Sequence, residues 1–170
     1  CLLLLLDSSA SMDLAEWKLQ VEGTAKALMS EPVVKAATSS GLALAAIEWS
    51  DLQHVILPWT SITTQHDLKQ AGDALVSHHR RGDNSTDVVG ALKAAIQVLS
   101  AQPQCSRTVV DISSDGPHNS SGDDGWGQNE IAVLSAMGAQ VNALAILDED
   151  GVETYYRDLI GTQGFIIPAT

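Results

Sequence analysis

Three oxygen-bearing side chains occupy alternate positions in a short polar stretch near the start of the chain, at Asp7, Ser9 and Ser11. This alternation lets one carboxylate and two hydroxyls converge on a single point. Hard cations prefer oxygen ligands, and magnesium takes about six of them, with only one or two protein carboxylates and several waters. Thr86 and Asp115 carry further oxygens that could complete the shell. The pattern therefore indicates a site for Mg²⁺, or for Mn²⁺ or Ca²⁺.

The two acids of this set, Asp7 and Asp115, follow apolar segments that have the character of buried strands. Leu2–Leu6 is an unbroken apolar run that ends at Asp7, and a second run, Thr108–Ile112, ends in the polar turn 113–116 that contains Asp115. Short apolar runs bounded by polar residues are typical of central parallel strands buried on both faces. Ligands of such sheets bind beyond the carboxyl ends of the strands, where the strand order reverses. We therefore expect both acids at one end of the sheet, on neighbouring strands.

The rest of the chain alternates between helical and strand patterns. The link 50–53 between two strand patterns is too short for a crossover, so it predicts an antiparallel hairpin and one reversed edge strand. We predict a Rossmann-like, three-layer α/β/α fold in one domain, residues 1–170, with a six-stranded, mostly parallel sheet in the order 3-2-1-4-5-6. The predicted helices are 13–30, 65–77, 87–100, 128–137 and 152–160, and the further strands are 42–49, 54–59, 141–147 and 164–167.

Composition excludes several classes of function. The formal net charge is −12 with only nine Lys and Arg residues, which argues against nucleic-acid binding and favours cations or basic surfaces. No apolar run approaches the roughly 20 residues that a membrane span needs. The chain opens inside an expected strand without an initiator Met, so we expect that upstream sequence is missing and could have included a signal peptide.

The two cysteines precede the two expected central strands. Cys1 and Cys105 form neither a disulfide framework nor a zinc spacing, so we interpret them as unpaired structural thiols. The alternative is a bridge at the end of the sheet away from the cation site, which requires the two Cα atoms to lie within about 7 Å.

The polar residues at the strand ends resemble the metal-ion-dependent adhesion site of von Willebrand factor type A domains. That motif is D-x-S-x-S, then a Thr ahead of a helix, then an Asp in a (T/S/G)-D-G turn. The first part matches residues 7–11, the second matches Thr86–Leu92 as T-x-x-x-x-A-L, and the third matches residues 114–116. The first motif alone is common, but three motifs in order at strand ends are specific together.

Nearly the whole chain is similar to one bacterial subfamily of type A domains known mainly as a domain of unknown function. The matching stretches are Glu48-Trp-Ser50, Pro58-Trp-Thr60, Asp111–Pro117, and Tyr155-Tyr156 ahead of Gly164-Phe165. Three positions depart from the usual patterns: Ser114 replaces a Gly, His118 replaces one Asn, and Ala10 stands where many type A domains have Gly. None of these changes removes a proposed ligand.

The resemblance implies a role for each site residue. Ser9 and Ser11 would bind the metal directly, Asp7 would orient metal-bound waters, and Thr86 and Asp115 would exchange direct and water-mediated roles. An acidic side chain of a protein partner would fill the last coordination position. The resemblance therefore implies a non-enzymatic, metal-dependent protein-binding module, exported to the periplasm or the outside of a bacterial cell.

Other interpretations of the same residues remain. The five polar residues could serve only turns and helix caps, or the domain could be structural with a vestigial metal site. A Mg²⁺-dependent phosphoryl-transfer or hydrolase-type enzyme is the main rival, but aspartate-nucleophile phosphatases need a second acid two residues after the first, where Ser9 stands. No G-x-S-x-G elbow or phosphate-binding glycine loop occurs. We interpret His78 and His79 as a solvated helix end, and Trp126 as an aromatic that could touch a partner.

Overall fold

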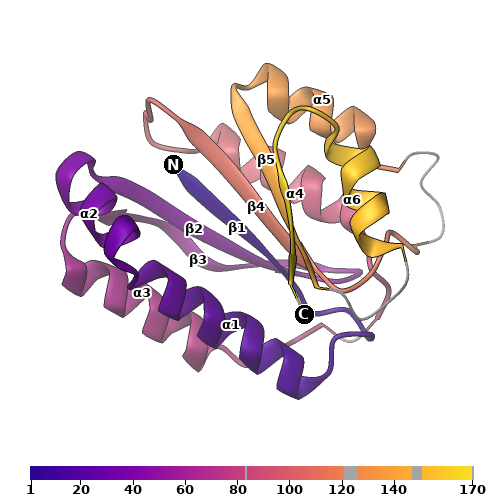
Figure 1. The fold of residues 1–170 in the computed structure, drawn as a ribbon, viewed down its shortest axis with the longest axis horizontal. Coiled ribbons are helices and arrows are strands. Elements are labelled where there is room, and N and C mark those ends of the chain that lie inside the picture. The colour runs from indigo at the N-terminus through magenta and orange to yellow at the C-terminus, as the bar shows by residue number, and fades with distance from the viewer. Residues whose placement is uncertain (83, 121–125, 147–150, 170) are drawn as a thin grey trace.

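One six-stranded sheet forms the centre of the protein, with helices on both faces (Figure 1). The computed structural model describes residues 1–82, 84–120, 126–146 and 151–169. The elements are β1 (Leu2–Asp7), α1 (Leu14–Leu28), α2 (Glu31–Ser40), β2 (Leu42–Trp49), β3 (Gln53–Ile62), α3 (Gln65–Ser77), α4 (Val88–Ser100), β4 (Thr108–Ser114), α5 (Gln128–Ala136), β5 (Ala139–Ile146), α6 (Val152–Ile160) and β6 (Ile166–Ala169).

The strand order is β3-β2-β1-β4-β5-β6, which confirms the predicted order. The edge strand β3 runs antiparallel to β2, and every other neighbouring pair is parallel. β1 lies between β2 and β4. From β1 the chain continues through β2 to β3 on one side, and it then crosses to β4, β5 and β6 on the other side. The predicted reversal of strand order therefore falls between β1 and β4, as the position of the site requires.

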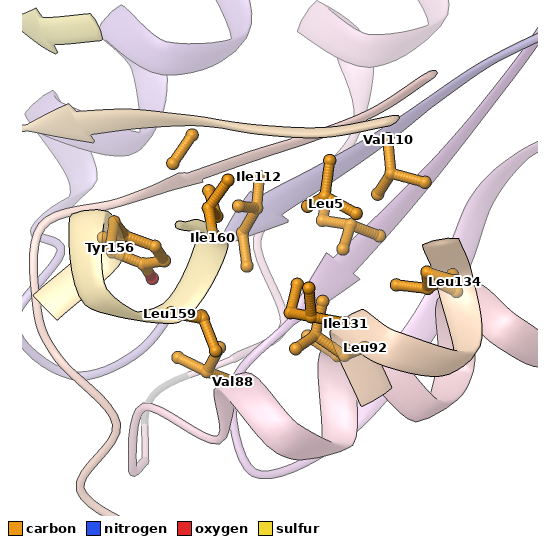
Figure 2. Close-up of a cluster of buried hydrophobic side chains, with 14 of the residues drawn as sticks. Leu5, Val88, Leu92, Val110, Ile112, Ile131, Leu134, Tyr156, Leu159 and Ile160 are labelled. Atoms are coloured by element: carbon orange, nitrogen blue, oxygen red, sulfur yellow. The ribbon is translucent and has the colours of Figure 1, made fainter. Parts of the chain in front are cut away.

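Two hydrophobic layers hold the helices against the sheet, and β1 contributes to both. Leu3 and Leu5 pack with α4, α5 and α6, whereas Leu4 and Leu6 pack with α1, α2 and α3. Figure 2 shows the first layer, where Leu5 of β1 and side chains of β4 face those of the three helices. Both faces of β1 are covered, which explains why its sequence is an unbroken apolar run rather than an alternating one.

Several element boundaries differ from the sequence prediction. Helix α2 was not predicted; only two residues separate it from α1, and Ala37 is its only fully buried residue. Its Pro32 lies in the first helical turn, where the missing N–H costs no intrahelical bond. Strand β4 continues through Ser113 and Ser114, where the sequence predicts a turn, because both residues stay paired with β5.

The interpretation of the cysteines as unpaired thiols is wrong, because Cys1 and Cys105 form a disulfide with a Cα–Cα distance of 5.6 Å. The cause is the pairing of β1 with β4. These strands run parallel with Leu2 opposite Val109, and the Val109 amide donates to the Cys1 carbonyl at 2.9 Å. The two segments that lead into the strands therefore lie side by side, within the distance that a bridge requires.

Replacing Cys1 and Cys105 together by serine should lower the free energy of unfolding by about 3–4 kcal/mol, because the bridge joins residues 104 positions apart and restricts the unfolded chain. Urea unfolding of the wild type and the double variant measures this difference. Thiol titration of the unreduced, urea-unfolded wild type should find no free thiol. Two reactive thiols per chain would contradict the bridge.

Candidate metal centre

Two buried carboxylates meet at the carboxyl ends of β1 and β4. Asp7 is the last residue of β1 and Asp115 directly follows β4, and neither side chain is exposed to solvent. Both oxygens of Asp7 accept hydrogen bonds, Oδ1 from the Ser9 amide at 2.7 Å and Oδ2 from the Ser114 hydroxyl at 2.5 Å. The orientation of the Asp7 carboxylate is therefore fixed by its own turn and by the neighbouring strand.

The hydroxyls of the first turn extend from Asp7 towards Asp115. The Oγ atoms of Ser9 and Ser11 lie 3.2 Å apart, and Ser11 Oγ donates to Asp115 Oδ1 at 2.8 Å. Ser9 is buried, whereas Ser11 is exposed. The fully buried side chain of Met12 anchors the end of the turn. The turn thus presents a row of oxygens that runs from the buried layer to the surface.

Thr86 reaches the same place from the segment that precedes α4. A β-carbon added to Gly116 would lie 3.6 Å from Thr86 Oγ1 and 3.8 Å from Ser11 Oγ, so the three loops converge around this glycine. Asn119 holds Thr86 through two bonds. Its side-chain Oδ1 accepts from the Thr86 backbone amide at 2.7 Å, and its backbone amide donates to the Thr86 carbonyl at 3.1 Å. Sequence reasoning did not assign a role to Asn119, whose contribution depends on this contact between distant loops.

These oxygens fit a hard divalent cation better than a soft one. The set contains two carboxylates and three hydroxyls, supplied by Asp7, Ser9, Ser11, Thr86 and Asp115. In the part of the chain that the structure describes, no group of three or more His, Cys, Asp or Glu side chains could hold a metal. A site built here therefore depends on hydroxyl oxygens and water, as magnesium sites commonly do.

The electrostatics of Asp7 point in the same direction. Burial raises the pKa of Asp7 to about 6; hydrogen bonds from Ser114 and Ser9 oppose the rise, and the charge of Asp115 adds to it. The ionised carboxylate is thus costly in this position when no cation is near. A divalent cation among these oxygens would offset that cost by direct attraction.

Residues outside the motif brace the first turn. The Arg80 guanidinium donates to the carbonyls of Ser8 at 3.0 Å and Ser9 at 2.7 Å, and the Ala10 amide donates to the Asn84 carbonyl at 2.7 Å. His78 and His79 do lie at the end of α3, and His79 is exposed. The interpretation of His78 as solvated is wrong, because its side chain is 15% exposed and its Nε2 lies 2.7 Å from Glu48 Oε2. Such contacts between a side chain and a distant loop have no local sequence signature.

Trp126 is exposed and lies beside the third loop. Its ring packs 5.9 Å from that of Tyr155, and both line a cleft of about 430 Å³ together with Pro117 and Asp158. Pro117 is two residues from Asp115, so the lining of this cleft includes the chain segment that directly follows the candidate cation site. The contact of Trp126 with a partner stays a prediction.

One protein-family model matches the entire chain. The model of the family described as "Protein of unknown function (DUF1194)" matches residues 1–170. The chain belongs to the DUF1194 family. No curated protein matches this DUF1194 chain in sequence.

Solved structures show that the DUF1194 chain has the von Willebrand factor type A fold. One similar structure is proximal thread matrix protein 1 from the mussel byssus with a zinc-occupied MIDAS motif: 18% identity, TM-score 0.80, covering 99% of this chain and 43% of that one. Another is the von Willebrand factor type A protein from Catenulispora acidiphila: 14% identity, TM-score 0.73, covering 99% and 38%. The vWF domain of the type V pili tip protein Mfa5 from Porphyromonas gingivalis gives 10% identity, TM-score 0.69, and covers 98% and 88%.

The DUF1194 chain therefore spans less than half the length of the mussel and Catenulispora proteins. At these identities the similarity establishes the fold and the likeness to type A domains. Within the described residues, none of the helices has the length and apolar character to cross a bilayer.

The metal-free protein should be more stable at low pH, where Asp7 is protonated, than at neutral pH, where its buried carboxylate is ionised. The folded-state pKa of Asp7, about 6, lies above the ordinary value of 3.8. The stabilising contribution of Asp7 to the free energy of unfolding is therefore fully present below about pH 4 and is lost as the pH rises to about 6. Asp7→Asn should thus raise the unfolding free energy by about 2 kcal/mol at pH 7 in chelator, and by much less at pH 4.

Thermal melts of both proteins from pH 4 to 7.5, with EDTA present, measure this difference. Asp73→Asn is the control, because Asp73 is an exposed acid on α3, paired with Lys69 at 2.6 Å. A difference between Asp7→Asn and wild type that stays constant with pH would refute the interpretation.

Proposed function

We propose that this chain is a divalent-cation-dependent protein-binding module. Asp7, Ser9, Ser11, Thr86 and Asp115 hold Mg²⁺, or Mn²⁺ or Ca²⁺, and an acidic group of a protein partner completes the coordination. The observation that carries the proposal is the convergence of these oxygen side chains from three loops at the ends of β1 and β4. The zinc-occupied MIDAS motif of the mussel matrix protein, which shares the fold, supports it.

The balance of charge within the site favours capture of a carboxylate. Only two of the five oxygen donors are ionisable, and Asp7 already accepts hydrogen bonds at both of its oxygens. Three of the five ligands are neutral hydroxyls, so the two carboxylates can at most balance the charge of a divalent cation, which remains electrophilic. Ser11 lies at the exposed side of the site, so an incoming carboxylate can approach there and gain a charge-assisted bond in place of water.

The rival enzymatic function is less well supported by the geometry. An aspartate nucleophile must reach its substrate, but Asp7 is completely buried and lies behind the turn that contains Ser9. The position two residues after Asp7 is that serine rather than a second acid. The site suits holding a cation better than phosphoryl transfer, so we assign the chain a binding role without catalysis.

The disulfide supports a place outside the reducing cytoplasm. Bridges such as Cys1–Cys105 persist in oxidising compartments, including the bacterial periplasm and cell exterior. One protein with the same fold is a pili tip protein. We therefore propose that the module is exported by a bacterium and meets its partner there.

Titration with Mg²⁺ and Mn²⁺ tests the site directly. Wild-type protein should release or absorb measurable heat at micromolar to millimolar metal, and Asp7→Ala should give none. At metal concentrations 100-fold above Kd, mass action adds about 2.7 kcal/mol to stability, so the wild-type Tm should rise by about 5–10 °C.

Asp73→Ala serves as the matched control, since it removes one exposed acid of α3 that is not among the proposed ligands and should bind metal as the wild type does. Equal heats for the wild type and Asp7→Ala, or no heat from the wild type at millimolar metal, would refute the cation site.

An open coordination position can be detected with manganese. Adding acetate to the Mn²⁺-loaded protein should lower the water-proton relaxation rate, because the carboxylate displaces a metal-bound water. Potassium chloride at equal ionic strength should leave the rate unchanged. If acetate acts no differently from chloride, the cation is not available to a carboxylate and the proposed mode of partner capture is wrong.

A further inference from the structure

Glu48, the seventh residue of β2, is a completely buried carboxylate that the cation site does not use. Its Oε1 accepts from the amides of Arg81 at 2.5 Å and Gly82 at 3.0 Å, and its Oε2 lies 2.7 Å from His78 Nε2. These three partners all belong to the segment that follows α3. One acid near the carboxyl end of β2 therefore fastens residues 78–82 to the sheet.

A buried carboxylate is expensive unless it is well bonded, so this arrangement requires an explanation. Burial raises the pKa of Glu48, but the hydrogen bonds from the Arg81 amide, His78 and the Gly82 amide outweigh burial and lower it overall. Glu48 is therefore ionised at neutral pH. An apolar side chain could fill the same space, but it could not orient two backbone amides.

The fastened segment is also the one that braces the first turn of the cation site. Arg80 donates to the carbonyls of Ser8 and Ser9. Gly82 packs so closely that an added β-carbon would lie 2.1 Å from Ser8 Oγ. Further along, the Asn84 carbonyl accepts from the Ala10 amide, and Thr86 follows two residues later.

We propose that Glu48 is a positioning residue for the cation site. Through residues 78–82 it fixes the turn that carries Ser9 and Ser11, and it sets the approach of Thr86. Glu48 does not touch the cation. This inference rests on the proposed function, because it assigns the source of rigidity of the same site.

The test compares Glu48→Ala and Glu48→Gln with Asp111→Ala. Asp111 is a partly buried acid in mid-strand β4, bonded to Asn142 at 2.7 Å, so its loss should destabilise the fold without moving the loops. Glu48→Gln keeps an oxygen that can accept from both amides. The readouts are Mg²⁺ affinity by calorimetry and, with EDTA present, hydrogen exchange of the amides of Ala10, Arg81 and Gly82.

Glu48→Ala should weaken Mg²⁺ binding about tenfold or more, as loss of supporting bonds around metal ligands commonly does, and should speed exchange at all three amides. The Mg²⁺ affinity of Glu48→Gln should stay within about threefold of that of the wild type. Asp111→Ala should lower the Tm but change neither the affinity nor the exchange.

Arg80→Met provides a second route that leaves the core intact. Removing a positive charge near a cation should tighten binding by simple electrostatics, whereas loss of the braced turn should weaken it. We expect weaker binding. Tighter binding by Arg80→Met, or unchanged affinity in Glu48→Ala despite faster exchange at Arg81 and Gly82, would overturn the inference while leaving the proposed function intact. Failure of the wild type to bind Mg²⁺ would overturn both.

Discussion

The parallel pairing of β1 with β4 is the constraint on which the rest of the molecule depends. At one end of this pair the entering segments lie close enough for Cys1 and Cys105 to bridge. At the other end Asp7 and Asp115 emerge together, and the Ser114 hydroxyl of β4 bonds the Asp7 carboxylate of β1. A shift of one strand relative to the other would separate both pairs. The disulfide at one end of this strand pair and the acidic site at the other end therefore both depend on the same register.

Three acids in or beside the sheet show how burial of charge is compensated in different ways. Glu48 is satisfied by backbone amides and His78, which lower its pKa. Asp111 has Asn142 as its hydrogen-bond partner, although burial still raises its pKa. Asp7 has two good hydrogen bonds, yet burial and Asp115 leave its pKa near 6. Ser114 supplies one of those bonds, so this residue at the end of β4 supports the buried carboxylate of β1.

Sequence patterns predicted the features that depend on local periodicity and on strand ends. The strand order, the reversed edge strand and the meeting of Asp7 with Asp115 all followed from apolar runs and link lengths. Helix α2 was not among them, because only two residues separate it from the end of α1, and so short a link ahead of a proline gives no clear sign of a second helix. The disulfide could have been inferred from the predicted adjacency of the two strands, had that adjacency been weighed above the small number of cysteines.

The contacts of Glu48 could not have been predicted, and the reason bears on how such sites are built. Its partners include two backbone amides 33 and 34 residues away, and an amide carries no mark of residue type. The D-x-S-x-S motif therefore identifies the candidate ligand oxygens. How precisely they are placed depends on long-range interactions that have no sequence motif. Glycine at position 82 follows the same logic: the close approach to Ser8 demands it, but only the folded chain shows what approaches. Binding strength in such a site should thus vary among chains with identical motifs, according to how firmly the neighbouring segment is held.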